Sequence, residues 1–82
     1  MKDKGIKQNN PDNFIVQGMM KNDNDLEYAY ISHNGDETVM LNLKFKKGIQ
    51  NKDKYVKLSR YMKKVRAEYK GKNVNATMIV DN

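Results

Sequence analysis

The sequence predicts an α+β fold, a single small domain in which one amphipathic helix packs on one face of a mainly antiparallel four-stranded sheet. Three observations lead to this prediction. The chain has 82 residues, which is enough for one hydrophobic core. Two segments in which apolar and polar residues alternate flank an Asn-Gly pair, and this pattern is typical of a β-hairpin. A later segment has apolar residues three and four positions apart, which is typical of a helix, and the expected element order is βββαβ.

The N-terminal part is expected to hold an arm followed by a strand. Residues 1–12 contain turn-forming residues and no hydrophobic period, so we interpret them as a flexible arm and place the domain at residues 13–82. Residues 14–20 form a short apolar run rich in β-forming types, which predicts the first strand, and Gly18 indicates a bulge within it. Residues 22–25, Asn-Asp-Asn-Asp, predict a turn.

The second and third strands are predicted as a hairpin around Asn34 and Gly35. This pair is preferred in two-residue type I′ turns, so counting outward from it places Tyr30 opposite Val39. The predicted apolar face then consists of Leu26, Tyr28, Tyr30, Val39, Leu41, Leu43 and Phe45. The opposite face has a mixed character, so the hydrophobic pattern and the turn chemistry agree on this register.

A basic loop over residues 46–54 leads into the predicted helix. The apolar stripe of that helix consists of Leu58, Tyr61, Met62, Val65 and Tyr69. Asp53 is a candidate N-terminal cap, and Gly71 stands where a left-handed residue often ends a helix. Residues 74–80 alternate apolar and mostly polar side chains, which predicts the fourth strand.

An incomplete barrel is the alternative architecture. The element order resembles that of the oligonucleotide-binding barrel, which places its helix between strands three and four. That barrel has five strands, whereas the sequence supplies segments for four. No motif in the chain identifies a family.

The charge of the chain is concentrated in one segment. Residues 44–72 contain twelve Lys or Arg and only two acids, Asp53 and Glu68, which gives this segment a charge of +10. The whole chain carries +6, because residues 1–43 contribute −3 and residues 73–82 contribute −1. A contiguous field of one sign attracts polyanions and accelerates their capture, so nucleic acid is the expected partner.

The basic loop and the basic face of the helix form the predicted binding site. The expected nucleic-acid contacts are Lys44, Lys46, Lys47, Lys54, Tyr55, Lys57, Arg60, Lys63, Lys64, Arg66 and Lys70. Fourteen of the sixteen basic residues are lysines, which act as point charges, whereas arginine makes the bidentate contacts that read guanine. We therefore expect binding to the phosphate backbone with little sequence discrimination, DNA being favoured over RNA. A solvated lysine-rich helix face without a partner is the alternative interpretation.

Aromatic residues raise the prospect of single-strand binding, because bases stack on aromatic rings while a basic groove follows the phosphates. The predicted register assigns Tyr28 and Tyr30 to the core. Tyr55 and Phe45 flank the basic loop and are better candidates for stacking. An open aromatic hairpin face would instead make the sheet a stacking platform, with the helix covering the other side.

Enzymatic and metal-dependent functions are not expected. His33 near Asp36 lacks a nucleophile at a defined spacing, and Asp23, Asp25 and Glu27 do not complete a calcium loop. The chain has no cysteine and one histidine, so we expect no disulfide, metal or cofactor. It also has no long apolar run, so we expect a cytoplasmic protein with neither a signal peptide nor a membrane span.

Two further expectations concern the biological setting and the partner. The small size and the many lysines and asparagines suit an AT-rich phage or mobile element, where such a protein could act in replication or regulation. Strand edges in a domain this small could pair two copies into a homodimer. The alternative function is a small inhibitor or adaptor whose basic face docks on an acidic protein, since carboxylates and phosphates attract the same lysines.

Overall fold

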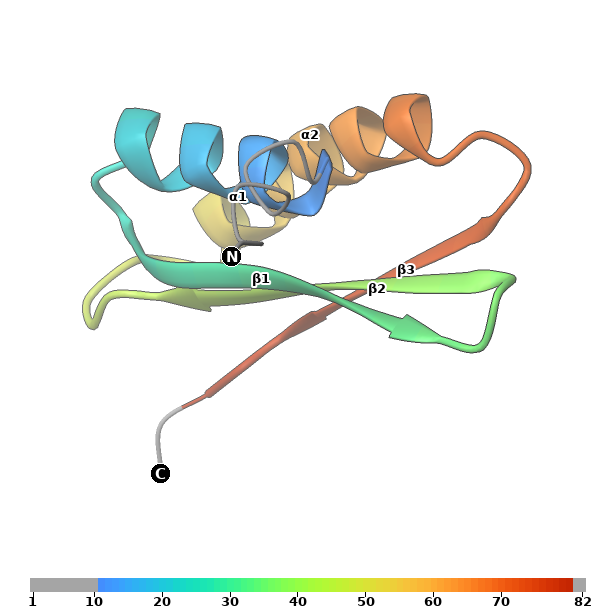
Figure 1. The fold of residues 1–82 in the computed structure, drawn as a ribbon. Helices are drawn as coiled ribbons and strands as arrows, with labels where there is room; N and C mark the ends of the chain where they lie inside the picture. Colours follow the sequence, from blue (N-terminus) through green and yellow to red (C-terminus); the bar gives the residue numbers. More distant parts are fainter. Residues whose placement is uncertain (1–10, 81–82) are drawn as a thin grey trace.

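The computed structural model describes residues 11–80, and the side chains from residue 14 onward. Within this range the elements follow the order αββαβ (Figure 1). They are α1 (Pro11–Asn22), β1 (Leu26–Asn34), β2 (Thr38–Phe45), α2 (Asn51–Glu68) and β3 (Asn73–Met78). Most of the predicted N-terminal arm lies outside the described residues, and its last two positions, Pro11 and Asp12, belong to α1.

The sheet has three strands in the order β1-β2-β3, and both helices cover one face of it (Figure 1). β1 pairs with β2 in the antiparallel direction, whereas β3 pairs with β2 in the parallel direction. The predicted βββαβ order, the mainly antiparallel four-stranded sheet, the single helix and the barrel alternative are therefore wrong. The physical reason for the parallel pair is α2, which carries the chain back along the sheet so that β3 can start beside the start of β2.

Residues 14–20, predicted as a strand, belong to helix α1. Val16 and Met19 are buried against the sheet and Ile15 is partly buried, while Phe14 on the opposite side is 63% exposed. This spacing has the helical period, and Pro11 suits a first helical turn, where no hydrogen bond from its nitrogen is needed. The β-forming residue types misled the prediction, because burial of one helix face outweighs local propensity.

The hairpin forms as predicted, but its register differs. Asn34 pairs with Thr38, so Gly35, Asp36 and Glu37 make a three-residue loop in which Gly35 has a φ of 72°. This offset of an odd number of residues turns the other face of β1 toward the helices. Ala29 then becomes a core residue.

A bulge in β1 keeps Leu26 in the core despite this change of face. The register shifts between Leu26 and Tyr28, so that Leu26 and Ala29 are both buried and the two residues between them are exposed. The predicted core positions of Tyr28 and Tyr30 are therefore wrong. The small side chain of Ala29 lets α1 lie close to β1, whereas buried tyrosines would have needed partners for their hydroxyl groups.

The core lies between the sheet and the two helices. Its fully buried side chains are Val39, Leu41, Leu43 and Val65. Tyr61 and Val65 supply the buried face of α2, as the predicted stripe requires. α2 begins at Asn51 with Gln50 as its N-cap, so the predicted cap at Asp53 is wrong, and Asp53 lies instead in the first turn, where a negative charge is favourable. Gly71 has the expected positive φ, at 85°.

Candidate nucleic-acid interface

One face of the sheet has no helix on it among the described residues, because α1 and α2 both lie on the other side (Figure 1). The strand pairings identify the side chains of this open face, since paired residues point to the same side. They are Tyr28, Tyr30 and Ser32 from β1, Thr38, Met40, Asn42 and Lys44 from β2, and Asn73, Asn75 and Thr77 from β3. Aromatic, amide, hydroxyl and ammonium groups therefore dominate a face that a second apolar layer would normally cover.

Tyr28 and Tyr30 form a stacked pair on the open face. Their ring centroids are 6.2 Å apart and their planes are 23° from parallel. Tyr28 is 37% exposed and Tyr30 is 47% exposed, so both rings keep part of their surface accessible. The register set by the three-residue hairpin loop puts both tyrosines on this face, and the β1 bulge allows Leu26 to remain buried beside them. Two adjacent accessible rings are the arrangement on which successive bases can stack.

Lys44 places a positive charge next to the tyrosine pair. It pairs with Tyr28 across the two strands, and its ammonium nitrogen lies 5.9 Å from the centre of the Tyr28 ring. The same nitrogen lies 3.9 Å from Oε1 of Glu27, the residue within the bulge. Glu27 is about half exposed, so this ion pair is a weak one that solvent can screen.

Asn42 anchors the centre of the open face. Only 7% of its surface is exposed, although it lies on the uncovered side of the central strand. Its Nδ2 lies 3.2 Å from Oγ of Ser32, 3.2 Å from the carbonyl oxygen of Met40 and 3.4 Å from that of Tyr30. These donor contacts hold the β1 and β2 side chains in one arrangement, which reduces the entropy lost when a ligand binds.

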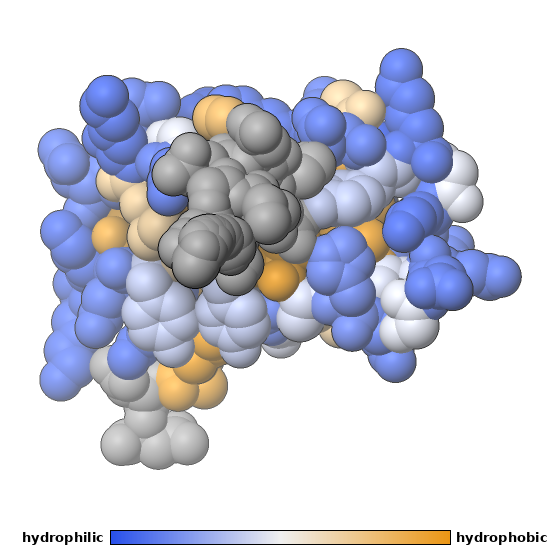
Figure 2. Space-filling model, in the orientation of Figure 1, coloured by the Kyte–Doolittle hydropathy of each residue, from blue (hydrophilic) through white to orange (hydrophobic). Residues whose placement is uncertain are grey.

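The basic residues of the predicted site lie on different parts of the fold. Lys44 lies on the open sheet face, and Lys46, Lys47 and Lys54 gather at the end of β2. Arg60, Lys63, Lys64, Arg66 and Lys70 are exposed on or just beyond α2, and Tyr55 is exposed in its second turn. Hydrophilic residues make up most of the visible molecular face, and hydrophobic ones reach it in small separate patches (Figure 2).

Lys57 has an internal role that the sequence did not indicate. Its ammonium nitrogen lies 2.7 Å from Oδ1 of Asp23 and 2.7 Å from Oδ2 of Asp25. The hydroxyl group of Tyr61 donates a hydrogen bond to Oδ2 of Asp23. The hydrogen bond that Lys57 donates to Asp23, followed by the one it donates to Asp25, raises the pKa of Lys57 to about 12. Lys57 therefore stabilises the fold at this point.

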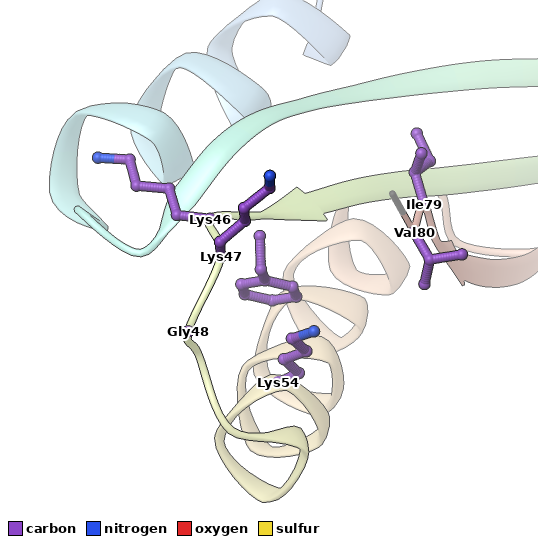
Figure 3. Close-up of a pocket in the computed structure, with 7 residues that line it drawn as sticks. Lys46, Lys47, Gly48, Lys54, Ile79 and Val80 are labelled. Carbon is purple, nitrogen blue, oxygen red and sulfur yellow. The ribbon is translucent and has the colours of Figure 1, made fainter. Parts of the chain in front are cut away.

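A shallow hollow lies where β2 ends. It has a volume of about 260 Å³ and is lined by Phe45, Lys46, Lys47, Gly48, Lys54, Ile79 and Val80. Lys47 comes from the loop after β2 and Lys54 from the first turn of α2, while Ile79 and Val80 follow β3 (Figure 3). Figure 3 shows that the Lys46 side chain extends away from Val80.

Two functional features could not be read from the predicted register. Tyr28 and Tyr30 were assigned to the core, and Asn42 was assigned to the mixed opposite face without a role. A signal was nevertheless present, because Ala29 and Ile31 alternate with Tyr28 and Tyr30, so that either face of this segment was apolar enough to be buried.

Comparison with known proteins gives no matching family model, no matching curated protein and no matching solved structure. Within residues 11–80, no helix is long and apolar enough to cross a membrane. The same part of the chain contains no group of three or more His, Asp or Glu side chains that could hold a metal ion.

Proposed function

We propose that this protein is a non-enzymatic, single-stranded nucleic-acid-binding protein with little sequence preference. The observation that carries the proposal is the stacked and accessible Tyr28–Tyr30 pair beside Lys44, on a sheet face that neither helix covers. Bases stack on the two rings, and lysines at the end of β2 contact the phosphates on either side. DNA is favoured over RNA as the partner, as the sequence indicated.

The energies involved are sufficient for binding. Stacking of a base on an aromatic side chain contributes about 1–3 kcal/mol, so two rings supply roughly 2–6 kcal/mol before any charge contributes. Stacking tolerates all four bases, because each has an aromatic face. The charge of +6 adds an attraction that depends on salt concentration and not on sequence.

The setting is part of the proposal. We place the protein in the cytoplasm of a bacterium, in the replication or regulation of a phage or mobile element, on the basis of its size and its lysine and asparagine content. β1 and β3 are the two edges of the sheet within the described residues, and either edge could pair two copies into a homodimer.

The test measures fluorescence anisotropy of labelled single-stranded DNA, single-stranded RNA and duplex DNA of equal length at several salt concentrations. We expect single strands to bind more tightly than duplex, with the logarithm of affinity falling about 0.7 per phosphate contact for each unit of log salt concentration. The double variant Tyr28→Leu/Tyr30→Leu should lose at least about tenfold in affinity, since each ring stacks one base.

Phe14→Leu is the matched control, because Phe14 is an exposed aromatic residue on α1 outside the open face. It should bind as the unchanged protein does. Unaltered affinity in the double tyrosine variant would refute the open face as the binding surface. Absence of binding to all three nucleic acids at about 50 mM salt would refute the proposal and favour an acidic protein as the partner.

A further inference from the structure

The hollow at the end of β2 brings together two lysines that have no carboxylate partner. Lys47 and Lys54 line it from two different elements, and neither makes an ion pair with any described residue. Lys57 differs from them, because its charge is neutralised by Asp23 and Asp25. No acidic side chain is among the residues that line the hollow. Its electrostatic potential therefore favours an anion.

The rest of the hollow is apolar and narrow. Phe45, Ile79 and Val80 also line it, and Gly48 adds no side chain. Its volume of about 260 Å³ lies below the roughly 300–1,000 Å³ of pockets that hold drug-sized ligands. A phosphate group attached to one sugar suits such a space, with the oxygens toward the ammonium groups and the sugar toward the apolar wall.

The phosphate group at the end of a nucleic-acid strand carries a different charge from the phosphates within the strand. An internal phosphodiester carries one negative charge, whereas a phosphomonoester carries about −1.5 to −2 at pH 7. Two ammonium groups that line one hollow, neither of them ion-paired with a described residue, match the charge of a phosphomonoester better than that of a phosphodiester. Lysines spread along an open groove would have been the expected arrangement for internal phosphates alone.

The hollow and the stacking face meet β2 at neighbouring residues on opposite sides of the strand. Lys44 belongs to the open face beside Tyr28, and the next residue, Phe45, lines the hollow from the other side, so a nucleic-acid strand that occupies both would pass round the end of β2. We propose that the hollow binds the terminal phosphomonoester of a nucleic-acid strand whose bases stack on Tyr28 and Tyr30. This inference rests on the proposed function and adds a preference for strand ends to it.

The experiment compares single-stranded oligonucleotides of about ten nucleotides, within the usual site size, that carry a 5′-phosphate, a 3′-phosphate or no terminal phosphate. Affinities are measured by competition against a labelled strand. We expect one phosphorylated form to bind about fivefold more tightly than the unphosphorylated strand. Two exposed ion pairs together contribute a binding free energy of about this size. The end that carries the advantage gives the direction of the strand on the sheet.

Variants assign the preference to the hollow. The double variant Lys47→Met/Lys54→Met keeps the aliphatic part of both side chains but removes their charges. For this variant, the affinities for the phosphorylated and the unphosphorylated oligonucleotide should differ by less than about twofold. Lys52→Met/Lys72→Met removes the same charge from exposed positions outside the hollow and should retain the preference. Circular dichroism confirms that both variants fold.

The outcomes separate this inference from the function on which it rests. Binding of all three oligonucleotides with equal affinity would overturn the terminal-phosphate site and leave the stacking function intact. A preference that persists in Lys47→Met/Lys54→Met would also overturn it. Failure of every oligonucleotide to bind would instead overturn the stacking function itself.

Discussion

The ammonium group of Lys57 lies 2.7 Å from Oδ1 of Asp23 and so joins α2 to the turn between α1 and β1. Asp23 is only 6% exposed, and its other oxygen accepts the hydrogen bond from Tyr61. Asp23 also accepts a backbone hydrogen bond from Asp25 at 2.9 Å, which closes the turn. One carboxylate thus connects the two helices and the start of the sheet, a role that its position in a turn cluster did not reveal.

Replacement of this carboxylate should destabilise the protein. Asp23→Asn removes the charge that neutralises a partly buried ammonium group, and we expect a loss of about 2–3 kcal/mol in the free energy of unfolding. Urea denaturation followed by circular dichroism measures this loss. Asp36→Asn, an exposed position in the hairpin loop, is the matched control and should change stability by less than about 0.5 kcal/mol. Equal midpoints for the two variants would contradict the role of Asp23.

Stability should also fall in acid for the same reason. Burial raises the pKa of the Asp23 carboxyl, but hydrogen bonds from Lys57, Tyr61 and the backbone of Asp25 lower it by more, so that it lies below its ordinary value of 3.8. A lowered folded-state pKa gives stability that is present above pH 3.8 and is lost as the pH falls through the folded value. Thermal unfolding of the unchanged protein and of Asp23→Asn at several acidic pH values tests this. The variant should lose less stability as the pH falls, because the titrating carboxyl is absent.

At high pH, folding stability is expected to fall as the pH rises, which is the opposite of its dependence in acid. Burial, and then the hydrogen bond to Asp23, raises the pKa of Tyr61 to about 12, and the pKa of Lys57 is also raised to about 12. Raised values give stability that is present below the unfolded pKa values of 10.0 and 10.5 and is lost as the pH rises toward 12. Tyrosinate absorbance should include a phase near pH 12, and Tyr61→Phe should remove that phase. A late phase that persists in Tyr61→Phe would contradict the assignment.

Two glycines should respond oppositely to replacement by alanine. Gly18 lies inside α1 with no atom within 4 Å of an added Cβ, so Gly18→Ala should stabilise the protein by about 0.5–1 kcal/mol. Gly35 has a φ of 72° in the hairpin loop, so Gly35→Ala should destabilise it by about 1–2 kcal/mol. Thermal unfolding of both variants measures the difference. Stabilisation by Gly35→Ala would contradict the left-handed conformation.

The sequence predicted the hairpin, α2 and the last strand, because each has a hydrophobic period that local chemistry supports. Val74, Ala76 and Met78 alternate toward the core as expected, and Tyr61 and Val65 are buried. The parallel pairing of β3 was not predictable from alternation, which is the same in both directions. It depends on where the chain returns after α2.

The errors arose where local preference and tertiary packing disagree. Ile15 and Val16 favour strands in isolation, yet packing on β1 makes their segment helical. Asn34 and Gly35 favour a two-residue turn, yet a three-residue loop puts Ala29 under α1 and frees Tyr28. Of the candidate site, the sequence identified Lys44 and the lysines of the hollow, whereas the stacked tyrosines required the actual register.

The parallel pairing of β3 with β2 has a consequence for how the chain assembles during synthesis. Within the described residues β2 is the only strand with which β3 pairs, and β3 is the last of the described elements to leave the ribosome. α1, the hairpin and α2 can meet earlier through contacts closer in sequence, but one side of β2 keeps its peptide groups unpaired until the final strand arrives. The sheet is therefore completed only after α2 and β3 have both been synthesised, and a chain cut short after α2 would expose a template for association with other chains.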